Sequence, residues 1–491
     1  MNKPIRTLSI FCLLLFLALL GNVTYLQYIQ ASELNNASEH PENRRVIEAA
    51  FSRERGAILV GRTPIAESVP SDDKYEFQRR YTNPRLYAHL TGWFSFFNQA
   101  GLERTQNDVL SGDDDRLFVS RLVDLVNNSG AKGGSVKLTI DREAQVAAYK
   151  GLLDNPQLGK DVQGAVVALE PGSGKVLAMV SSPTFDPNEL ASHDLSAVEK
   201  AAKKLNERKD RPLENRAIRR DLPPGSVFKL VTAAAALETG DYDADSMVTG
   251  GPTYKLPGTS TSIGNGGRNC GATKVSLTQA LAQSCNTTFL ALANELGQDK
   301  LLKQAEAFGF NDTSLEDLPG QLQSTFPSKE MSDDYLAKSG IGQQDVRATP
   351  LQMAMVVAGI VNNGTVMKPY VVDEVRSPDL DVLDKADPKE LSEAVSSDTA
   401  RELRKMMVNV VDRGTAGVAR IPGVEVGAKT GTAEGCQDCN DYAWFVSYAD
   451  VDGKQVAVAV MLEKVNLSND QIAGGALAGP IAKSVMEAVI D

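Results

Sequence analysis

The longest apolar run lies near the start of the chain. Two basic residues precede an uncharged stretch at residues 7–32, whose core reads LSIFCLLLFLALL. About 20 apolar residues span a bilayer, and basic flanking residues stay on the cytoplasmic side. We therefore expect a cytoplasmic tail at 1–6, a transmembrane anchor at 7–28 and an extracytoplasmic remainder. A cleaved signal peptide is the alternative, but no convincing small-x-small cleavage site follows the run, and both interpretations export the rest of the chain.

Further along, apolar segments of strand length occur in two pairs. Segments 164–170 (GAVVALE) and 175–181 (KVLAMVS) flank a Pro-Gly-Ser-Gly turn, and segments 442–449 (YAWFVSYA) and 454–463 (KQVAVAVMLE) flank an Asp-Gly turn. Both patterns predict β-hairpins. Between the pairs, residues 195–410 show mostly helical periodicity, with Gly- and Asn-rich loops. The pattern predicts one sheet with helices packed on it and a separate helical lobe.

The remaining segments complete the predicted organisation. A polar linker is expected at 33–45, and strand-like residues at 51–67 belong to a small α+β module at 29–135. A short strand (VKLTI) begins a larger mixed α/β domain at 136–491, and an Ala-rich amphipathic helix at 473–490 ends it.

The composition excludes several classes of protein. The 491 residues carry a net charge of −12, which repels a phosphate backbone, so nucleic acid is not expected as a partner. The three histidines are His40, His89 and His193, and no metal-binding motif is visible, so we expect no metal and no cofactor. A Ser-His-Asp hydrolase would have to take its base from the N-terminal half, which favours a mechanism without histidine.

Four of the five cysteines lie in the part of the chain that is expected to be exported. Disulfides persist in the oxidising space outside the cytoplasm, and four cysteines allow three pairings. We favour a bridge between Cys270 and Cys285. For Cys436 and Cys439, a tight loop bridge and a zinc site both stay open, although zinc usually needs a second ligand pair and no histidine is near in sequence.

Three short motifs carry the candidate chemistry, and the first contains a serine and a lysine. Residues 223–229 read PPGSVFK and precede an apolar helical run. Ser226 is therefore expected at a helix start, near unpaired N–H groups and the positive end of the dipole. Lys229 lies three residues later on the same face, and burial would lower its pKa so that it acts as a base toward the serine. Taken alone, this pattern is common where a serine only caps a helix.

The second motif is Ser284-Cys285-Asn286. Ser284 offers a hydroxyl for proton relay, and Asn286 offers an amide that can hold a peptide. A loop rich in small polar residues would have the same composition, so this motif carries weight only together with the others.

The third motif, Lys429-Thr430-Gly431-Thr432, lies in a predicted strand. The two threonines can bond a substrate carboxylate, and Lys429 adds positive charge near it. Gly431 would allow the backbone of a ligand to approach closely. A lysine that protects an edge strand is the simpler alternative.

In this order, the three motifs resemble those of penicillin-binding proteins and class A β-lactamases, with Ser-Cys-Asn in place of Ser-Asp-Asn. Five further segments make the resemblance specific to class B penicillin-binding proteins, and among them to the short PBPA type of actinobacteria. These segments are RGAILV (55–60), NRA (215–217), SGIGQQDVRATPLQMA (339–354), GTA (414–416) and WFVSYA (444–449). The resemblance covers nearly the whole chain.

The resemblance implies a fold and a reaction. The fold is a penicillin-binding, β-lactamase-like transpeptidase domain at 136–491, with a central antiparallel sheet, helices on both faces and a helical lobe. A class B module of the dimerisation or pedestal type precedes it at 29–135. The reaction cross-links peptidoglycan stem peptides through an acyl-enzyme on Ser226, which also reacts covalently with β-lactams. The protein would be single-pass in the cell membrane and would work with a SEDS polymerase of the RodA/FtsW kind.

The resemblance also implies residue roles. Ser226 attacks the D-Ala-D-Ala carbonyl, Lys229 takes the serine proton, and Ser284 relays a proton to the leaving amine. The backbone N–H groups of Ser226 and Thr432 form the oxyanion hole. Asn286 holds the peptide. The terminal carboxylate is engaged by Lys429, Thr430 and Thr432.

Three alternatives share part of this pattern. A D,D-carboxypeptidase forms the same acyl-enzyme and releases it to water. A class A β-lactamase needs a deacylating Glu between the second and third motifs, and none is identifiable. A non-catalytic β-lactam sensor or scaffold is disfavoured by the intact set of motifs and by the short segment before the apolar run.

Overall fold

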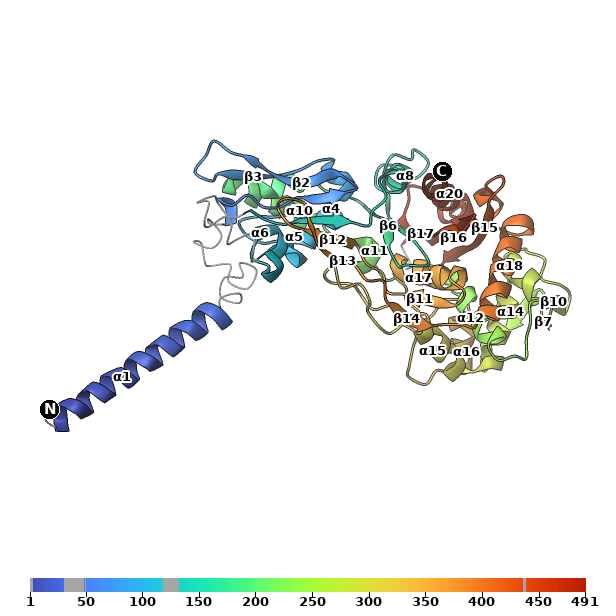
Figure 1. Cartoon of the computed structure of the whole chain (residues 1–491). Helices are drawn as coiled ribbons and strands as arrows, with labels where there is room; N and C mark the ends of the chain where they lie inside the picture. Colours follow the sequence, from blue (N-terminus) through green and yellow to red (C-terminus); the bar gives the residue numbers. More distant parts are fainter. Residues whose placement is uncertain (1–2, 31–47, 49, 118–131, 436–438) are drawn as a thin grey trace.

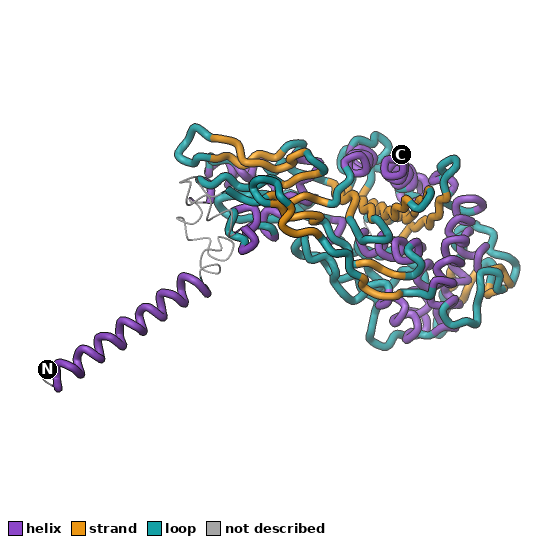
Figure 2. The backbone as a smooth tube through the Cα atoms, viewed as in Figure 1, coloured by secondary structure: helices purple, strands orange, loops and turns teal. Residues whose placement is uncertain are grey.

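The computed structural model describes residues 3–30, 48, 50–117, 132–435 and 439–491. Figure 1 shows three parts: an N-terminal helix, a smaller folded unit, and a larger unit that contains the C-terminus. Figure 2 shows strands in both folded units and most of the helices in the larger one. The polar linker expected at 33–45 lies outside the described residues.

The N-terminal helix α1 (Lys3–Thr24) continues into a π-helical turn, η1 (Tyr25–Ile29). No residue of α1 is buried. Within the described part of the chain, Lys3–Gln27 is the one helix long and apolar enough to cross a membrane, and a signal sequence meets the same criteria. This stretch overlaps the anchor expected at 7–28.

The smaller unit is built on a six-stranded sheet in the order β13-β12-β4-β1-β2-β3. Strands β1 and β4 pair in parallel, and the other neighbours are antiparallel. The strands are β1 (Ile58–Val60), β2 (Thr63–Pro70), β3 (Phe77–Tyr81), β4 (Ser135–Leu138), β12 (Val372–Arg376) and β13 (Val382–Lys385). The boundary expected between residues 135 and 136 therefore runs through a strand of this sheet, and a segment from the larger unit completes it. Pairing between such distant segments leaves no local sequence signal.

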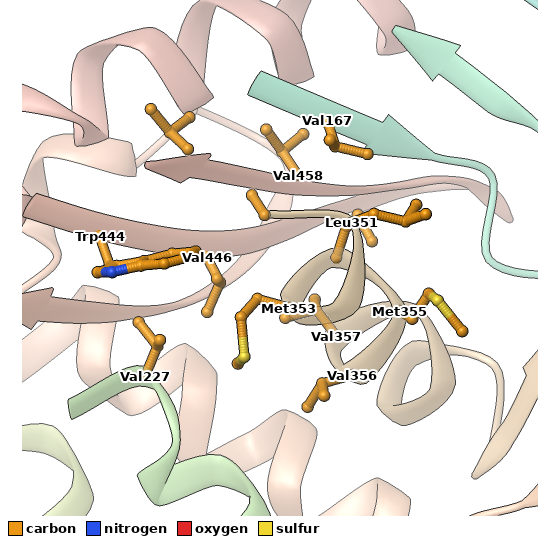
Figure 3. Packing of buried hydrophobic residues seen from close by; sticks show 14 of the residues in the cluster. Val167, Val227, Leu351, Met353, Met355, Val356, Val357, Trp444, Val446 and Val458 are labelled. Carbon is orange, nitrogen blue, oxygen red and sulfur yellow. The ribbon is translucent and has the colours of Figure 1, made fainter. Parts of the chain in front are cut away.

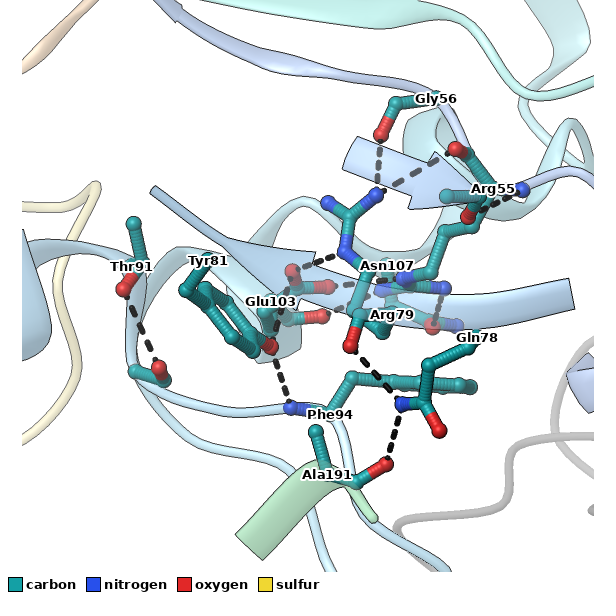
Figure 4. A network of polar contacts seen from close by, with 12 residues as sticks. Arg55, Gly56, Gln78, Arg79, Tyr81, Thr91, Phe94, Glu103, Asn107 and Ala191 are labelled. Carbon is teal, nitrogen blue, oxygen red and sulfur yellow. Dashed lines mark hydrogen bonds and ion pairs between the residues drawn. The ribbon is translucent and has the colours of Figure 1, made fainter. Parts of the chain in front are cut away.

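A buried cluster of charges holds the smaller unit together (Figure 4). Glu103 Oε2 accepts a hydrogen bond from Arg55 Nε at 2.7 Å, and Oε1 accepts one from Arg79 Nε at 2.7 Å. Burial alone would raise the pKa of Glu103, but the two arginines hold it below its usual value. Because Glu103 lies on the short helix α5 (Gly101–Thr105), the cluster joins this helix to the strands. The neighbouring helices are α4 (Pro84–Thr91), α6 (Asn107–Ser111) and η2 (Asp115–Leu117).

The larger unit contains a five-stranded antiparallel sheet in the order β15-β16-β17-β5-β6. Its strands are β5 (Gln163–Leu169), β6 (Val176–Ser182), β15 (Glu425–Ala433), β16 (Tyr442–Val451) and β17 (Lys454–Lys464). Both predicted hairpins are confirmed. At the centre of the sheet, β17 from the end of the chain pairs with β5 from the beginning of this unit. Strand β15 lies at one edge of the sheet.

Helices cover both faces of this sheet, as predicted. Helix α17 (Pro350–Val361) is buried along its whole length, and Figure 3 shows Leu351 and Met353 beside side chains of the sheet such as Val446. On the opposite face, α8 (Arg142–Leu153) and α20 (Gly479–Ile490) pack against each other and against the strands. The site described below therefore lies on a scaffold that is buried on both sides.

The middle of the chain forms the helical lobe. Its principal helices are α12 (Lys229–Leu237), α13 (Leu277–Ala282), α14 (Asn286–Leu296), α15 (Gln298–Ala307), α16 (Asp333–Ser339) and α18 (Ser397–Arg413). The sequence predicted only loops between these helices, but three two-stranded sheets lie there: β7 (Met247–Thr249) with β10 (Lys274–Ser276), β8 (Thr253–Lys255) with β9 (Ser262–Gly264), and β11 (Thr365–Met367) with β14 (Glu390–Glu393). Strands of three or four residues are too short to show alternation.

Short helical elements complete the described chain. They are α9 (Asn188–Ala191), α10 (Leu195–Asn206), α11 (Arg216–Arg219), η3 (Gly225–Val227), η4 (Gly417–Ala419), η5 (Asn469–Gln471) and α19 (Gly474–Leu477).

Candidate active site

Ser226 lies in the tight turn η3, directly before α12. The sequence predicted a helix start here, and the structure adds a 3₁₀ turn. Gly225 has φ +56, and its N–H donates to the Gly342 carbonyl at 2.9 Å. A Cβ at position 225 would lie 2.8 Å from the Thr432 carbonyl oxygen. The turn is thus held between β15 and the loop at residue 342, with the Ser226 side chain half-buried.

A second contact holds the chain just before the serine. The indole Nε1 of Trp444, on β16, donates to the Pro223 carbonyl at 3.0 Å, and the Trp444 side chain is fully buried. The position of Ser226 is therefore fixed by the core of the sheet as well as by its own helix.

Lys229 is fully buried in the first turn of α12. Its Nζ donates to the Asn286 Oδ1 at 2.7 Å, to the Ser284 carbonyl at 2.9 Å and to the Ser284 Oγ at 3.3 Å. The first motif is therefore bonded directly to the second.

Ser284 lies between two lysines. Its Oγ accepts a hydrogen bond from Lys429 Nζ at 2.9 Å in addition to the contact with Lys229. A hydroxyl has two acceptor sites and one proton, so its own proton stays available for a group in the cleft. Ser284 has φ +56, in the left-handed region that a residue with a side chain rarely adopts.

The second motif is fastened to a neighbouring loop. Cys285 forms a disulfide with Cys270, and Asn286 Nδ2 donates to the Gly264 carbonyl at 3.0 Å. The loop that follows β9 therefore lies along the start of α14. The alternative concerning Cys436 and Cys439 involves Cys436, which lies outside the described residues.

The third motif lies on a strand, as predicted, and this strand, β15, is at the edge of the sheet. Lys429 is fully buried, and its Nζ also donates to the Thr430 carbonyl at 2.9 Å. The Thr430 hydroxyl is 2.7 Å from that of Thr415, whereas Thr432 is exposed. Because no strand among the described residues pairs with the outer edge of β15, an extended peptide can lie along it.

Gly431 has a different environment from the one that the sequence suggested. A Cβ at this position would lie 3.0 Å from Val227 Cγ1, 3.0 Å from Trp444 Cβ and 3.1 Å from the Pro224 carbonyl oxygen. The close neighbours of Gly431 are thus the serine turn and β16 of the protein itself. The glycine lets the first motif pack directly onto the third.

Burial and charge both act on the two motif lysines. Burial lowers the pKa of Lys229 well below its usual value, and the charges of Lys429 and Arg268 lower it further. Burial also lowers the pKa of Lys429, and Arg268 again adds to the effect. A lysine with a lowered pKa is unprotonated in a larger fraction of molecules, and can then accept a proton.

The three motifs open into one cleft of about 400 Å³. Besides motif residues, its lining includes Asn265, Arg268, Lys338, Gln343 and Glu434. The sequence drew attention to Gln343 through the segment 339–354, but it gave no signal for Arg268. A cavity of similar size, about 420 Å³, lies beside Tyr370 and Asp373 and contains none of the motif residues. The chemistry therefore points to the motif cleft.

Comparisons with known proteins identify the family. A family model described as the penicillin binding protein transpeptidase domain matches residues 164–487, and one described as the penicillin binding protein A dimerisation domain matches residues 55–136. The peptidoglycan D,D-transpeptidase PbpA of Mycolicibacterium smegmatis is 40% identical over 500 residues, covering 100% of this chain and 99% of its own. PbpA of Mycobacterium tuberculosis is 38% identical over 498 residues, with the same coverage.

Solved structures show the same relationship. A ceftriaxone acyl-enzyme complex of penicillin-binding protein A from M. tuberculosis has a TM-score of 0.84 at 38% identity, covering 90% of this chain and 100% of its own. A penicillin G acyl-enzyme complex of the same protein has a TM-score of 0.83 at 39% identity with the same coverage. With the transpeptidase model matching most of the chain and relatives aligning over all of it, the chain belongs to the penicillin-binding proteins, as a class B member of the PBPA type.

Proposed function

We propose that the protein is a peptidoglycan D,D-transpeptidase that forms an acyl-enzyme on Ser226 and binds β-lactams covalently at the same atom. The observation that carries the proposal is the position of the Ser284 hydroxyl, which accepts hydrogen bonds from Lys229 and from Lys429. This arrangement joins all three motifs beside a half-buried serine. The full-length similarity to peptidoglycan D,D-transpeptidases supports the same reaction.

In the first half-reaction, Ser226 Oγ attacks the carbonyl carbon between the two D-Ala residues, and Lys229 takes the hydroxyl proton. The negative oxygen of the tetrahedral intermediate is bound by the backbone N–H groups of Ser226 and Thr432. The C–N bond then breaks, and Ser284 passes a proton to the leaving amine of D-Ala.

In the second half-reaction, the amine of another stem peptide attacks the ester carbonyl. The ester C–O bond breaks, the proton that the attacking amine loses passes to Ser226 Oγ, and a new peptide bond cross-links the two peptides. With a β-lactam, the ring amide opens, but the amine stays attached to the acyl group and does not leave the cleft. The reaction needs no cofactor.

The remaining motif residues hold the substrate. Asn286 bonds the peptide backbone, and Thr430 and Thr432 present hydroxyls along the edge of β15 to the terminal carboxylate. Lys429 orients Ser284 through the hydrogen bond at 2.9 Å. Gly431 contributes by bringing the serine turn against this edge.

The N-terminal helix supports a location at the membrane. Residues 7–28 anchor a single-pass protein in the cell membrane, the tail at 1–6 is cytoplasmic, and the catalytic unit lies outside. Residues 29–135 form the class B module and 136–491 the transpeptidase domain, with the later strands β12 and β13 completing the sheet of the module. A SEDS polymerase of the RodA/FtsW kind supplies the glycan strands.

Mass spectrometry tests the proposal. Wild-type protein exposed to penicillin should gain the mass of one penicillin, and peptide mapping should place it on Ser226. Incubation with a donor and an acceptor stem peptide should then give the cross-linked dimer. A hydrolysed donor alone, with no dimer at saturating acceptor, would identify a carboxypeptidase, and an adduct elsewhere would refute the site.

A further inference from the structure

Among the described residues, two cations line the cleft outside the three motifs, Arg268 and Lys338. Lys338 Nζ lies over the ring of Tyr335, 5.5 Å from its centroid. The guanidinium of Arg268 has no hydrogen bond or ion pair to any residue that the structure describes. The residue is exposed to solvent, but the surrounding atoms bury part of the guanidinium and lower its pKa. Arg268 is thus a free positive charge at the mouth of the cleft that contains Ser226.

The loop that carries Arg268 is held in place by contacts on both sides of the arginine. Before it, the side chain of Asn265 accepts a hydrogen bond from the Thr287 N–H at 3.0 Å and donates to the Gly251 carbonyl at 2.8 Å. After it, Cys270 forms the disulfide with Cys285. A fixed loop loses less conformational entropy when its arginine binds a ligand.

Lys429 is poorly placed to supply this charge to a ligand. Its side chain is fully buried, and its Nζ donates to Ser284 Oγ and to the Thr430 carbonyl. An ammonium that is occupied within the protein offers little to a carboxylate in the cleft. An exposed guanidinium, in contrast, carries its charge at every physiological pH and presents a planar fork that matches a carboxylate.

We propose that Arg268 binds the free carboxylate of the peptide or β-lactam that occupies the cleft, and that Lys429 orients Ser284 instead. The inference rests on the proposed function, because it assumes that such substrates enter this cleft. It makes Arg268 a specificity-determining residue for anionic acyl donors. A donor without the carboxylate should gain nothing from it.

Two synthetic thioester donors can test this role. They share a D-alanyl acyl group, but the leaving group ends in a carboxylate in one and in a carboxamide in the other. We expect Arg268→Gln to lower kcat/KM for the carboxylate donor by about 10- to 100-fold, the range for losing a hydrogen bond to a charged group. The carboxamide donor should change by less than about threefold, and Arg268→Lys should restore part of the loss.

Lys255 provides a matched control, because it is exposed on the adjacent strand β8 and does not line the cleft. Lys255→Gln should leave both donors unchanged. An equal loss for both donors in Arg268→Gln would show that the residue only supports its loop, and no loss for either would show that it does not touch the carboxylate. Either result overturns the inference while the proposed function stands. Failure of the wild type to react with both donors and with penicillin would overturn both.

Discussion

Lys229 Nζ donates a hydrogen bond to Asn286 Oδ1 at 2.7 Å. The base proposed for the first motif is thus oriented by an amide from the second. An amide oxygen is a neutral acceptor, so it positions the amine without adding a negative charge that would favour the protonated form.

Asn286→Asp should therefore slow acylation while keeping the shape of the site. An opposite charge at this distance raises the pKa of a lysine by about 1–3 units, so less of Lys229 is unprotonated at neutral pH. We expect the rate constant for reaction with fluorescent penicillin to fall at least about tenfold at pH 7 and to recover partly at alkaline pH. Asn294→Asp, on the same helix, is the control, and wild-type rates in Asn286→Asp would contradict a basic role for Lys229.

The wild-type enzyme should react with penicillin at pH values well below 10.5, the ordinary pKa of a lysine. Burial and the charges of Lys429 and Arg268 lower the pKa of Lys229, so the amine stays unprotonated down to its lowered pKa, and the rate should fall only as the pH drops through that value. Lys229→Arg should be inactive at every pH, because arginine remains protonated. A rate that rises only near pH 10 would show that the pKa is not lowered.

Gly342→Ala should slow acylation of Ser226, because the added methyl group would collide with the turn that carries the serine. A Cβ at position 342 would lie 2.3 Å from the Gly225 carbonyl oxygen, so the turn that carries Ser226 would have to move. We expect acylation to fall at least about tenfold, since small displacements of reacting groups cost about that much or more. Gly240→Ala is a matched control, because Gly240 also has positive φ but no atom within 4 Å of the added methyl. Equal acylation by both variants would contradict this account.

The buried charge cluster should make Glu103→Gln strongly destabilising. Removing one partner of a buried ion pair costs about 3–5 kcal/mol, whereas Glu67→Gln, at an exposed pair with Arg80, should cost less than about 1 kcal/mol. Urea unfolding of the detergent-solubilised chain measures both. Because the pKa of Glu103 is lowered, its stabilisation is present above the ordinary value of 4.5 and is lost as the pH falls through the lowered pKa. Similar midpoints for the two variants would refute a structural role for the cluster.

The disulfide can be tested by alkylation of its cysteines and by its contribution to the free energy of unfolding. Cys270 and Cys285 should resist alkylation until a reductant is added. The double variant Cys270→Ala/Cys285→Ala should lose about 3 kcal/mol, the value for a closed loop of about 15 residues, given a sequence separation of 15. Free alkylation of both thiols in unreduced protein would contradict the bridge.

The sequence predicted the elements that have strong local patterns. The hairpins were visible because apolar residues run between turn residues, and the site was visible because three motifs occur in order. The further family segments have physical roles in the structure: Trp444 holds the chain before Ser226, Thr415 contacts Thr430, and Gly342 accepts the hydrogen bond from the serine turn.

The features that the sequence missed depend on contacts between distant segments. Arg268 is one arginine in a glycine-rich loop, and only the folding of that loop along α14 brings it into the cleft. The sequence singled out Gly431 for the close approach of a ligand, which stays a prediction. In the structure the serine turn, about 200 positions earlier, lies against this glycine. The pairing of β12 with β4 is equally invisible, since neither strand shows which partner it will find.

That last pairing has a consequence for how the protein is made. The sheet of the smaller unit lacks β12 and β13 until residue 385 has been synthesised, so the edge of β4 is unpaired during most of synthesis. The unpaired N–H and C=O groups at the edge of a nascent sheet can pair with strands of other chains. The two units therefore mature together, and a chain that stops before residue 372 would emerge with an open edge that captures strands from its neighbours.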